Sequence, residues 1–256
     1  MARNKLRKFE EISAFPNVIQ SPLEALHGEG FGMKGRWGET HFGNQAPVVL
    51  ELGCGKGEYT VGLGRLFPGK NFVGADIKGA RIWSGAKQAL EEHLPNVAFL
   101  RTRIELLPHF FAPGEVSEIW ITFPDPQMKK TGRRMTSAHF LRMYARLTGG
   151  KGTVHLKTDS PFMYAYTREI VRINRLPLTA ETEDLYCSRH ADGILSIRTF
   201  YEQQWLSRGM NIKYLRFVCE LREEYLEPDS LPEPDPYRSF GRSRRHQPDS
   251  PDLTGS

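Results

Sequence analysis

The sequence predicts an α/β protein with a doubly wound, mostly parallel β-sheet that carries helices on both faces. Two patterns support this fold class. Short β-branched apolar runs alternate with longer segments of helical spacing, and several of these runs end directly in glycines or carboxylates. Such residues belong at the carboxyl edge of a parallel sheet, where ligands bind. The 256 residues suffice for one large domain, and the composition of 39% hydrophobic and 25% charged residues is that of a globular chain.

The expected elements follow one another along the chain. The first strand, residues 48–52, is a Val-Val-Leu-Glu-Leu run closed by glycines. A helix over residues 59–67 stops at Pro68-Gly69. The remaining strands are expected over 71–76, 97–100, 119–123, 152–157 and 212–220, and the remaining helices over 78–94, 138–147, 162–174 and 200–208.

The composition divides the chain into three parts. Residues 1–46 hold many glycines and few periodic apolar runs, which predicts a basic, glycine-rich and irregular lead-in. Residues 47–226 contain the expected α/β domain. Over residues 227–256 the chain is rich in Pro, Asp, Ser and Arg and poor in apolar residues, so we expect a disordered tail.

Charge and cysteine content narrow the class of protein. The net charge of +5 and the pI of about 9.1 fit a polyanionic partner without requiring one. Cys54, Cys187 and Cys219 form no CxxC pair, so we expect neither disulfides nor a metal site, in a reducing cytoplasm. No apolar run approaches the ~18 residues of a membrane span, and the basic first residues lead into no signal-peptide core.

A glycine-rich loop, Glu51-Leu52-Gly53-Cys54-Gly55-Lys56-Gly57, follows the first expected strand. Its G-x-G-x-G spacing differs from the G-x-G-x-x-G of dinucleotide sites and from the phosphate-binding P-loop. Glu51 would repel a pyrophosphate and favours a cationic cofactor such as S-adenosylmethionine, which carries a sulfonium and an ammonium. Asp76, which ends the second strand, is placed to accept hydrogen bonds from a ribose diol. The alternative is that both acids are solvated strand ends.

The fourth expected strand ends in Phe123-Pro124-Asp125-Pro126. Two prolines fix the backbone, so we expect Asp125 to be held in place. Because Gln127 and Met128 follow, the Asn/Asp-Pro-Pro-aromatic box of amino-methylating enzymes is absent. Four cations come next and indicate phosphate contacts, with a solvated basic turn as the alternative; they are Lys129, Lys130, Arg133 and Arg134.

Two further polar groups come later in the chain. Lys157-Thr158-Asp159 ends the fifth expected strand, and Asp159 is expected to face the same site, to cap the following helix, or to do both at once. Thr199 and Glu202 stand three residues apart at the start of an expected helix. They either form a capping box or contact a substrate.

Taken together, these motifs resemble those of the bacterial-type tRNA (guanine-N7-)-methyltransferases, over roughly residues 9–220. The matching pieces are residues 51–57, 71–76, 123–126 with Lys129 and Arg133-Arg134, 157–159 and 199–202. The resemblance implies a Rossmann-like class I methyltransferase fold with a seven-stranded sheet. It also implies transfer of a methyl group from S-adenosyl-L-methionine to N7 of a guanosine in the variable loop of tRNA.

The resemblance assigns roles to individual residues. Asp125 is the expected catalytic residue. The expected cofactor-binding residues are Glu51, Gly53, Gly55, Gly57, Asp76, Thr102 and Asp125, and the expected substrate-binding residues are Lys129, Asp159, Thr199, Phe200, Tyr201 and Glu202. Two positions depart from the family pattern. Gln127 stands where the family usually has Trp, and Thr102 stands where an acidic or amide residue usually meets the adenine, with Glu105 as an alternative contact.

The expected chemistry needs no base, because guanine N7 carries a lone pair and no proton. Carboxylates near the developing positive charge and good positioning would then suffice, with Asp125, Asp159 and Glu202 as candidates. The expected partner is tRNA, without an obligatory protein partner, and the protein is expected to be a monomer or homodimer. Three alternatives stay open: a methyltransferase with another acceptor, a catalytically inactive RNA-binding relative and, disfavoured by the glycine spacing, a nicotinamide dehydrogenase.

Overall fold

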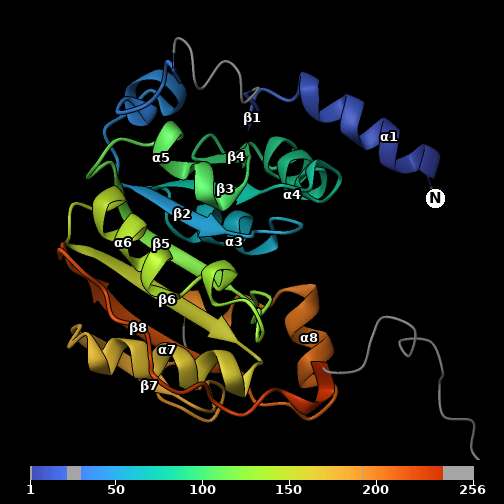
Figure 1. Cartoon of the computed structure of the whole chain (residues 1–256). Helices are drawn as coiled ribbons and strands as arrows, with labels where there is room; N and C mark the ends of the chain where they lie inside the picture. Colours follow the sequence, from blue (N-terminus) through green and yellow to red (C-terminus); the bar gives the residue numbers. More distant parts are fainter. Residues whose placement is uncertain (1, 22–29, 192, 239–256) are drawn as a thin grey trace, which may run out of the picture.

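The computed structural model describes residues 2–21, 30–191 and 193–238 and has one mostly parallel sheet with helices on both faces (Figure 1). The strands are β1 (Val18–Ile19), β2 (Val48–Leu52), β3 (Asn71–Asp76), β4 (Val97–Arg101), β5 (Val116–Thr122), β6 (Gly152–Thr158), β7 (Leu178–Thr182) and β8 (Lys213–Cys219). The α-helices are α1 (Ala2–Glu11), α3 (Glu58–Leu66), α4 (Gly79–Glu91), α5 (Leu107–Phe110), α6 (Ala138–Leu147), α7 (Pro161–Ile173) and α8 (Phe200–Leu206).

The order of the strands is β1-β4-β3-β2-β5-β6-β8-β7. Strands β1 to β6 pair in parallel, whereas β8 runs antiparallel to both β6 and β7. The chain order therefore reverses between β2 and β5, which makes the carboxyl ends of these two strands the topological switch point where open α/β sheets bind ligands.

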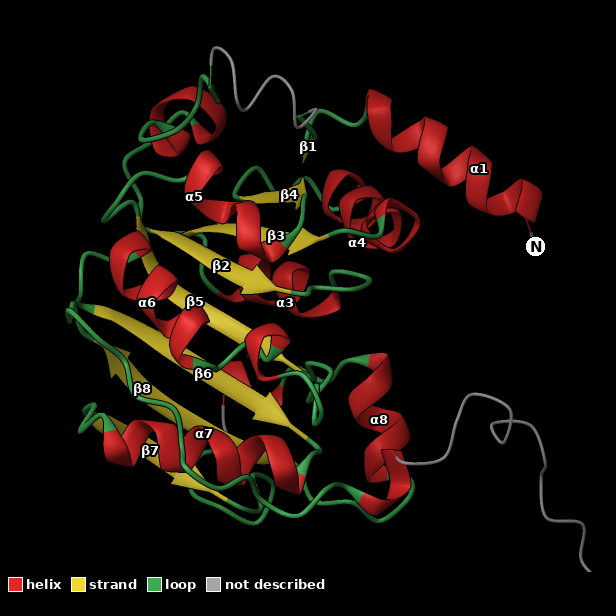
Figure 2. Ribbon diagram, in the orientation of Figure 1, coloured by secondary structure: helices red, strands yellow, loops and turns green. Residues whose placement is uncertain are grey.

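The sheet is buried on both faces, as its apolar strands predict. In β2, Leu50 and Leu52 pack in one core with residues of α6 and α7, and Val49 packs in the other with residues of α3. Figure 2 shows the twisted sheet between two layers of helices. The prediction of a doubly wound α/β fold is confirmed.

Two strands extend the sheet beyond the expected pattern. The resemblance implied seven strands, whereas the described residues form eight, because the two-residue β1 adds an edge beside β4. Strand β7 had no recognisable pattern in the sequence, since Ala180 is its one buried residue. An edge strand with one buried side chain lacks the apolar alternation on which such predictions depend.

The amino-terminal part is more ordered than the expected irregular lead-in. Helix α1 packs on α4, and Trp83 donates a hydrogen bond of 2.6 Å from its indole to Glu11. The fully buried Trp37 stacks on Phe111 and donates to the Phe110 carbonyl at 2.8 Å. Residues 22–29 of this lead-in lie outside the described residues.

The carboxyl-terminal segment also differs from the expected disordered tail. Residues 227–238 are described and contain the buried Asp235, which accepts hydrogen bonds from Ser160 and Phe162. Residues 239–256 lie outside the described part of the chain. Composition failed to predict this segment because its buried contacts are polar.

Candidate functional site

The glycine-rich loop joins β2 to α3 at the switch point of the sheet. Gly53, Gly55 and Gly57 all have left-handed backbone, with φ of 70°, 58° and 74°. A Cβ on Gly57 would lie 2.5 Å from the ring of Phe99, so the close approach of loop and sheet also requires glycine there.

Glu51, the next-to-last residue of β2, is only 2% exposed. Its carboxylate accepts hydrogen bonds from the Thr60 amide at 2.8 Å, from the Thr60 hydroxyl and from the Thr122 hydroxyl at 2.6 Å. Burial raises its pKa to about 7, against the opposing effect of these hydrogen bonds. The carboxylate therefore ties the start of α3 to the end of β5 and presents a group that a cationic ligand would favour in its ionised form.

Asp76 lies beside the loop at the end of β3. Its carboxylate accepts from the amide of Gly55 at 3.0 Å and from that of Lys78 at 2.8 Å. Thr102, after β4, donates its amide to the Asp76 carbonyl at 3.2 Å. Three of the predicted cofactor-binding regions therefore meet at one edge of the sheet.

A cavity of about 360 Å³ opens next to Asp76 and Thr102. Ile77, which is 53% exposed, and Leu106 give it apolar walls, and residues 101–103 line it as well. The sequence reasoning missed Ile77, although its place directly after Asp76 was the signal that could have found it. A larger cavity of about 690 Å³ lies between α7 and β7, and none of the predicted site residues lines it.

The residues after β5 have strained backbone. Phe123 and Gln127 both have positive φ, at 50° and 47°, although neither is a glycine. The exposed Asp125 lies between them and accepts a hydrogen bond from the Gln127 amide at 3.1 Å. Strain of this kind is kept where the surrounding structure fixes it, and it concentrates at functional sites.

The cation cluster divides into exposed and buried residues. Lys129, Lys130 and Arg133 are exposed. Arg134 is fully buried, with its guanidinium 4.0 Å from the ring centre of Tyr166. It donates to three successive backbone carbonyls, those of Pro126, Gln127 and Met128, at 3.1 to 3.3 Å. The prediction that Arg134 contacts phosphate is therefore wrong: this cation holds the strained turn that carries Asp125.

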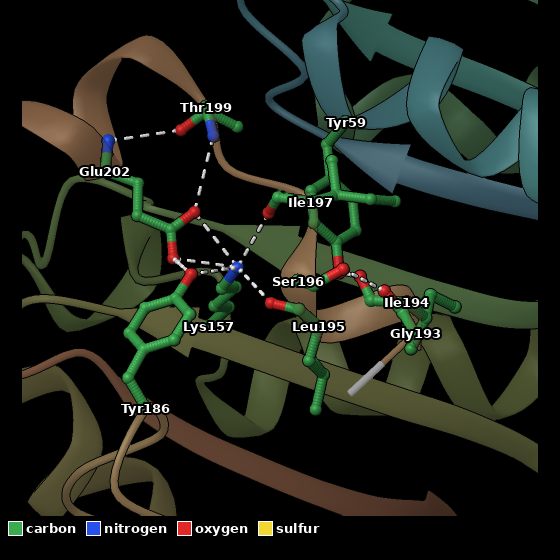
Figure 3. A network of polar contacts seen from close by, with 10 residues as sticks. All are labelled: Tyr59, Lys157, Tyr186, Gly193, Ile194, Leu195, Ser196, Ile197, Thr199 and Glu202. Carbon is green, nitrogen blue, oxygen red and sulfur yellow. Dashed lines mark hydrogen bonds and ion pairs between the residues drawn. The ribbon is translucent and has the colours of Figure 1, made fainter. Parts of the chain in front are cut away.

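Lys157, near the end of β6, is the centre of a buried polar network (Figure 3). Its ammonium donates to the carbonyls of Leu195 and Ile197 at 3.0 and 2.9 Å and lies 2.8 Å from Glu202 Oε1. Burial lowers the pKa of Lys157, and the carboxylate of Glu202 raises it. The network ties β6 to residues 193–202, a link that the sequence did not reveal.

Glu202 and Thr199 form the capping box of α8. The Glu202 amide donates to the Thr199 hydroxyl at 3.2 Å, and the Thr199 amide donates to Glu202 Oε2 at 3.3 Å. Tyr186 donates to the other oxygen of Glu202 at 2.5 Å, and Glu202 has no solvent exposure. Of the two interpretations of this pair, the structure contains the cap, whereas contact of Thr199 and Glu202 with a substrate stays a prediction.

The neighbouring aromatic residues lie at the surface, 45% exposed for Phe200 and 41% for Tyr201. The Phe200 amide donates to Glu58 at 3.0 Å, and the ammonium of Lys56 lies 4.2 Å from the centre of the Phe200 ring. Since Lys56 and Glu58 belong to the glycine loop and α3, the start of α8 borders the predicted cofactor site.

Asp159 follows β6 and is fully buried. Ser160, not Asp159, caps α7, because its side chain accepts from the Met163 amide at 2.9 Å. The Asp159 carboxylate accepts a hydrogen bond of 2.8 Å from the hydroxyl of Tyr237. The helix-cap interpretation of Asp159 is therefore wrong.

These residues fit S-adenosylmethionine. The carboxylates of Glu51 and Asp76 flank a backbone that three positive-φ glycines keep free of side chains, and the cavity with Ile77 offers apolar surface next to Asp76. Negative charge, a diol acceptor and an apolar wall match the cationic, ribose and adenine parts of that molecule.

The sheet order and the loop at its switch point define the class I methyltransferase fold. Solved structures agree with this class. The 16S rRNA methyltransferase KamB matches with a TM-score of 0.54 at 18% identity, covering 71% of this chain and 92% of that one. The 16S rRNA (adenine(1408)-N(1))-methyltransferase of Catenulisporales acidiphilia, as a mutant with its cosubstrate, matches with a TM-score of 0.53 at 14% identity, covering 73% and 91%.

Sequence relatives identify the family within this class. A family model described as a putative methyltransferase matches residues 45–215. The tRNA (guanine-N(7)-)-methyltransferase of Bacteroides thetaiotaomicron is 54% identical over 245 residues, which cover 96% of this chain and 97% of that protein. That of Porphyromonas gingivalis is 57% identical over 240 residues, 92% and 98% of the two chains. The chain therefore belongs to the tRNA (guanine-N(7)-)-methyltransferase family. Among its described residues, no helix has both the length and the apolar character to cross a membrane.

Proposed function

We propose that this protein transfers the methyl group of S-adenosyl-L-methionine to N7 of a guanosine in the variable loop of tRNA, in the cytoplasm. The observation that carries this proposal is the exposed Asp125, held on a strained turn beside the glycine loop and followed by three exposed cations. The likeness to relatives named for this activity supports it.

The cofactor supplies an electrophilic methyl group on a sulfonium. Gly53, Gly55 and Gly57 give it room, Glu51 favours its positive charge, and Asp76 accepts from its ribose diol. Ile77 and Thr102 border the place of its adenine.

On the acceptor side, the residues position a base that needs no deprotonation. Asp125 and Asp159 provide carboxylates for the N1–H and N2–H edge of guanine and for the positive charge that develops as N7 is methylated. Lys129, Lys130 and Arg133 contact phosphates. Phe200 and Tyr201 offer exposed rings at the border between cofactor and acceptor.

The test is nucleoside mass spectrometry of a tRNA transcript after incubation with protein and S-adenosylmethionine. The expected product is 7-methylguanosine, located by borohydride and aniline cleavage. A matched transcript with 7-deazaguanosine at the cleaved position lacks the acceptor atom and should take up no methyl group. Methylation of an exocyclic amine, or equal methylation of the 7-deaza transcript, would contradict the proposal.

A further inference from the structure

The C-terminal strap, residues 227–238, crosses α7 and ends beside α8 (Figure 1). Two carboxylates fasten it to helix starts. Glu227 accepts from the Ala138 amide of α6 at 2.8 Å and from the Tyr166 hydroxyl. Asp235, 1% exposed, accepts from the Phe162 amide of α7 at 2.9 Å and from the Ser160 hydroxyl. Acids at helix N-termini are well suited to such anchoring.

The strap also touches the proposed acceptor site. The Asp235 amide donates to the sulfur of Met128 at 3.2 Å, in the turn that carries Asp125. Two residues further on, Tyr237 donates its hydroxyl to Asp159 Oδ2 at 2.8 Å, and its ring centre lies 5.3 Å from that of Trp205 in α8. The tip of the strap therefore bridges the end of β6 and α8.

We propose that the Tyr237 hydroxyl occupies the place of the acceptor guanine's N–H donor at Asp159, so that the strap tip covers the acceptor site and must leave when tRNA binds. This inference rests on the proposed function, in which Asp159 binds guanine. A phenol O–H and a guanine N–H offer the same carboxylate the same kind of hydrogen bond. Asp159 has no solvent exposure beneath the strap, so a planar base reaches its carboxylate only after the cover moves.

The anchors permit such movement at the tip. Glu227 and Asp235 hold the strap through bonds to α6 and α7 that do not involve Asp159. Tyr237, beyond these anchors, is partly exposed. The strap can therefore stay fastened at Asp235 while Tyr237 swings out. Only the open form binds tRNA, so the apparent affinity for tRNA falls in proportion to the fraction of the protein that is open.

If Tyr237 positions Asp159 for catalysis, its removal has a different effect on the kinetics. If Tyr237 instead orients Asp159 in the productive complex, its hydroxyl stays in place during the reaction. Removing the hydroxyl would then lower turnover, whereas removing a cover lowers KM.

The test is steady-state methylation of a tRNA transcript by the full-length Tyr237→Phe protein. Losing one hydrogen bond that closes the site should lower KM for tRNA about fivefold, with KM for S-adenosylmethionine and kcat unchanged. Tyr225→Phe is the matched control, because this hydroxyl also lies in the C-terminal region but donates to the Glu220 carbonyl at 2.6 Å. It should leave KM for tRNA at the parental value.

Asp159→Asn distinguishes a failure of the proposed cover from a failure of the proposed role of Asp159 in guanine binding. If this variant loses activity while Tyr237→Phe leaves KM unchanged, raises it or lowers kcat, the cover is refuted and the proposed role of Asp159 stands. If Asp159→Asn methylates tRNA with parental kcat and KM, the role of Asp159 in guanine binding is refuted. The proposed cover is then refuted as well, because it depends on that role. A lower KM in Tyr237→Phe together with impaired Asp159→Asn supports both.

Discussion

The ammonium of Lys157 and the carboxylate of Glu202 form an ion pair of 2.8 Å in which neither side chain has any solvent exposure. The pair joins β6 to the capping box of α8, and the same ammonium donates to two carbonyls of the segment between them. Breaking a buried pair by removing one charge leaves the other uncompensated, which is costly. The position of α8 beside the predicted cofactor site therefore depends on this buried pair.

Glu202→Gln should lower the free energy of unfolding by on the order of 3 kcal/mol, because Lys157 loses its counter-charge in a dry environment. Thermal and urea unfolding measure the change. Glu91→Gln is the matched control, since Glu91 pairs with Lys87 on the exposed side of α4 and should melt like the parent. A Glu202→Gln protein with parental stability but little tRNA turnover would instead favour direct contact between Glu202 and guanine.

Glu51 should make cofactor binding depend on pH. Its pKa of about 7 means that the free protein holds a proton there below neutrality. A bound cation favours the ionised carboxylate and lowers this pKa, so S-adenosylmethionine binding releases a proton. The dissociation constant, measured by calorimetry, should fall severalfold as pH rises from about 6 to 7.5.

The matched variant for this prediction is Glu51→Gln, which cannot ionise and should bind with little pH dependence over the same range. The cofactor's own amino group titrates identically with both proteins, so their difference isolates Glu51. The folding stability of the free protein depends on pH in the opposite direction. The stabilisation that protonated Glu51 contributes to the folded state is complete below pH 4.5 and is lost as pH rises through about 7. Stabilisation of the parent by the cofactor should accordingly be larger at pH 8 than at pH 6.

The sequence predicted the parts of the site that local pattern determines. Glu51, the three glycines and Asp76 were expected to lie together because strand, loop and acid follow one another within a short stretch and parallel strands bring their ends together, and the structure places them at one edge of the sheet. The pair of Lys157 and Glu202 was not found, because its partners lie 45 residues apart and the pairing depends on burial that no local pattern encodes.

Arg134 shows why charge runs mislead. In sequence it looks like its neighbours Lys130 and Arg133, but the 3₁₀ turn Thr131–Arg133 turns the chain so that Arg134 faces inward, toward Phe162 and Tyr166. The strap was missed for a similar reason, since acids and prolines suggest disorder when their partners on α6 and α7 are unknown.

The exposed cations should determine the salt dependence of tRNA binding. Replacing Lys129 and Lys130 together by Ala should flatten the slope of log affinity against log salt by about one to two units. The double variant loses two phosphate contacts, so its binding to tRNA releases fewer counterions. Filter binding at several salt concentrations measures the slope. Lys87→Ala with Lys151→Ala removes the same charge at other surfaces; if both double variants change the slope equally, the phosphate surface is not the one proposed.

Arg134→Lys should slow methyl transfer without weakening cofactor binding. Lysine keeps the charge, but its ammonium cannot reproduce the planar fork that donates to the carbonyls of residues 126–128 while stacking on Tyr166. The turn would then relax from the positive φ at Gln127, and Asp125 would shift. A displacement of about 1 Å costs up to about a hundredfold in kcat. The dissociation constant of S-adenosylmethionine should stay at the parental value.

Arg133→Lys is the control for this change, because Arg133 is exposed whereas Arg134 is buried. It should alter tRNA affinity slightly and kcat hardly at all. Chemical rescue of Arg134→Ala gives a result that a merely structural role would not produce. Guanidinium ions, below denaturing concentration, should enter the space between the turn and Tyr166 and partly restore kcat. Methylammonium should not restore it. If guanidinium leaves kcat of Arg134→Ala unchanged while Arg134→Lys turns over tRNA at the parental rate, Arg134 stabilises the fold without positioning Asp125.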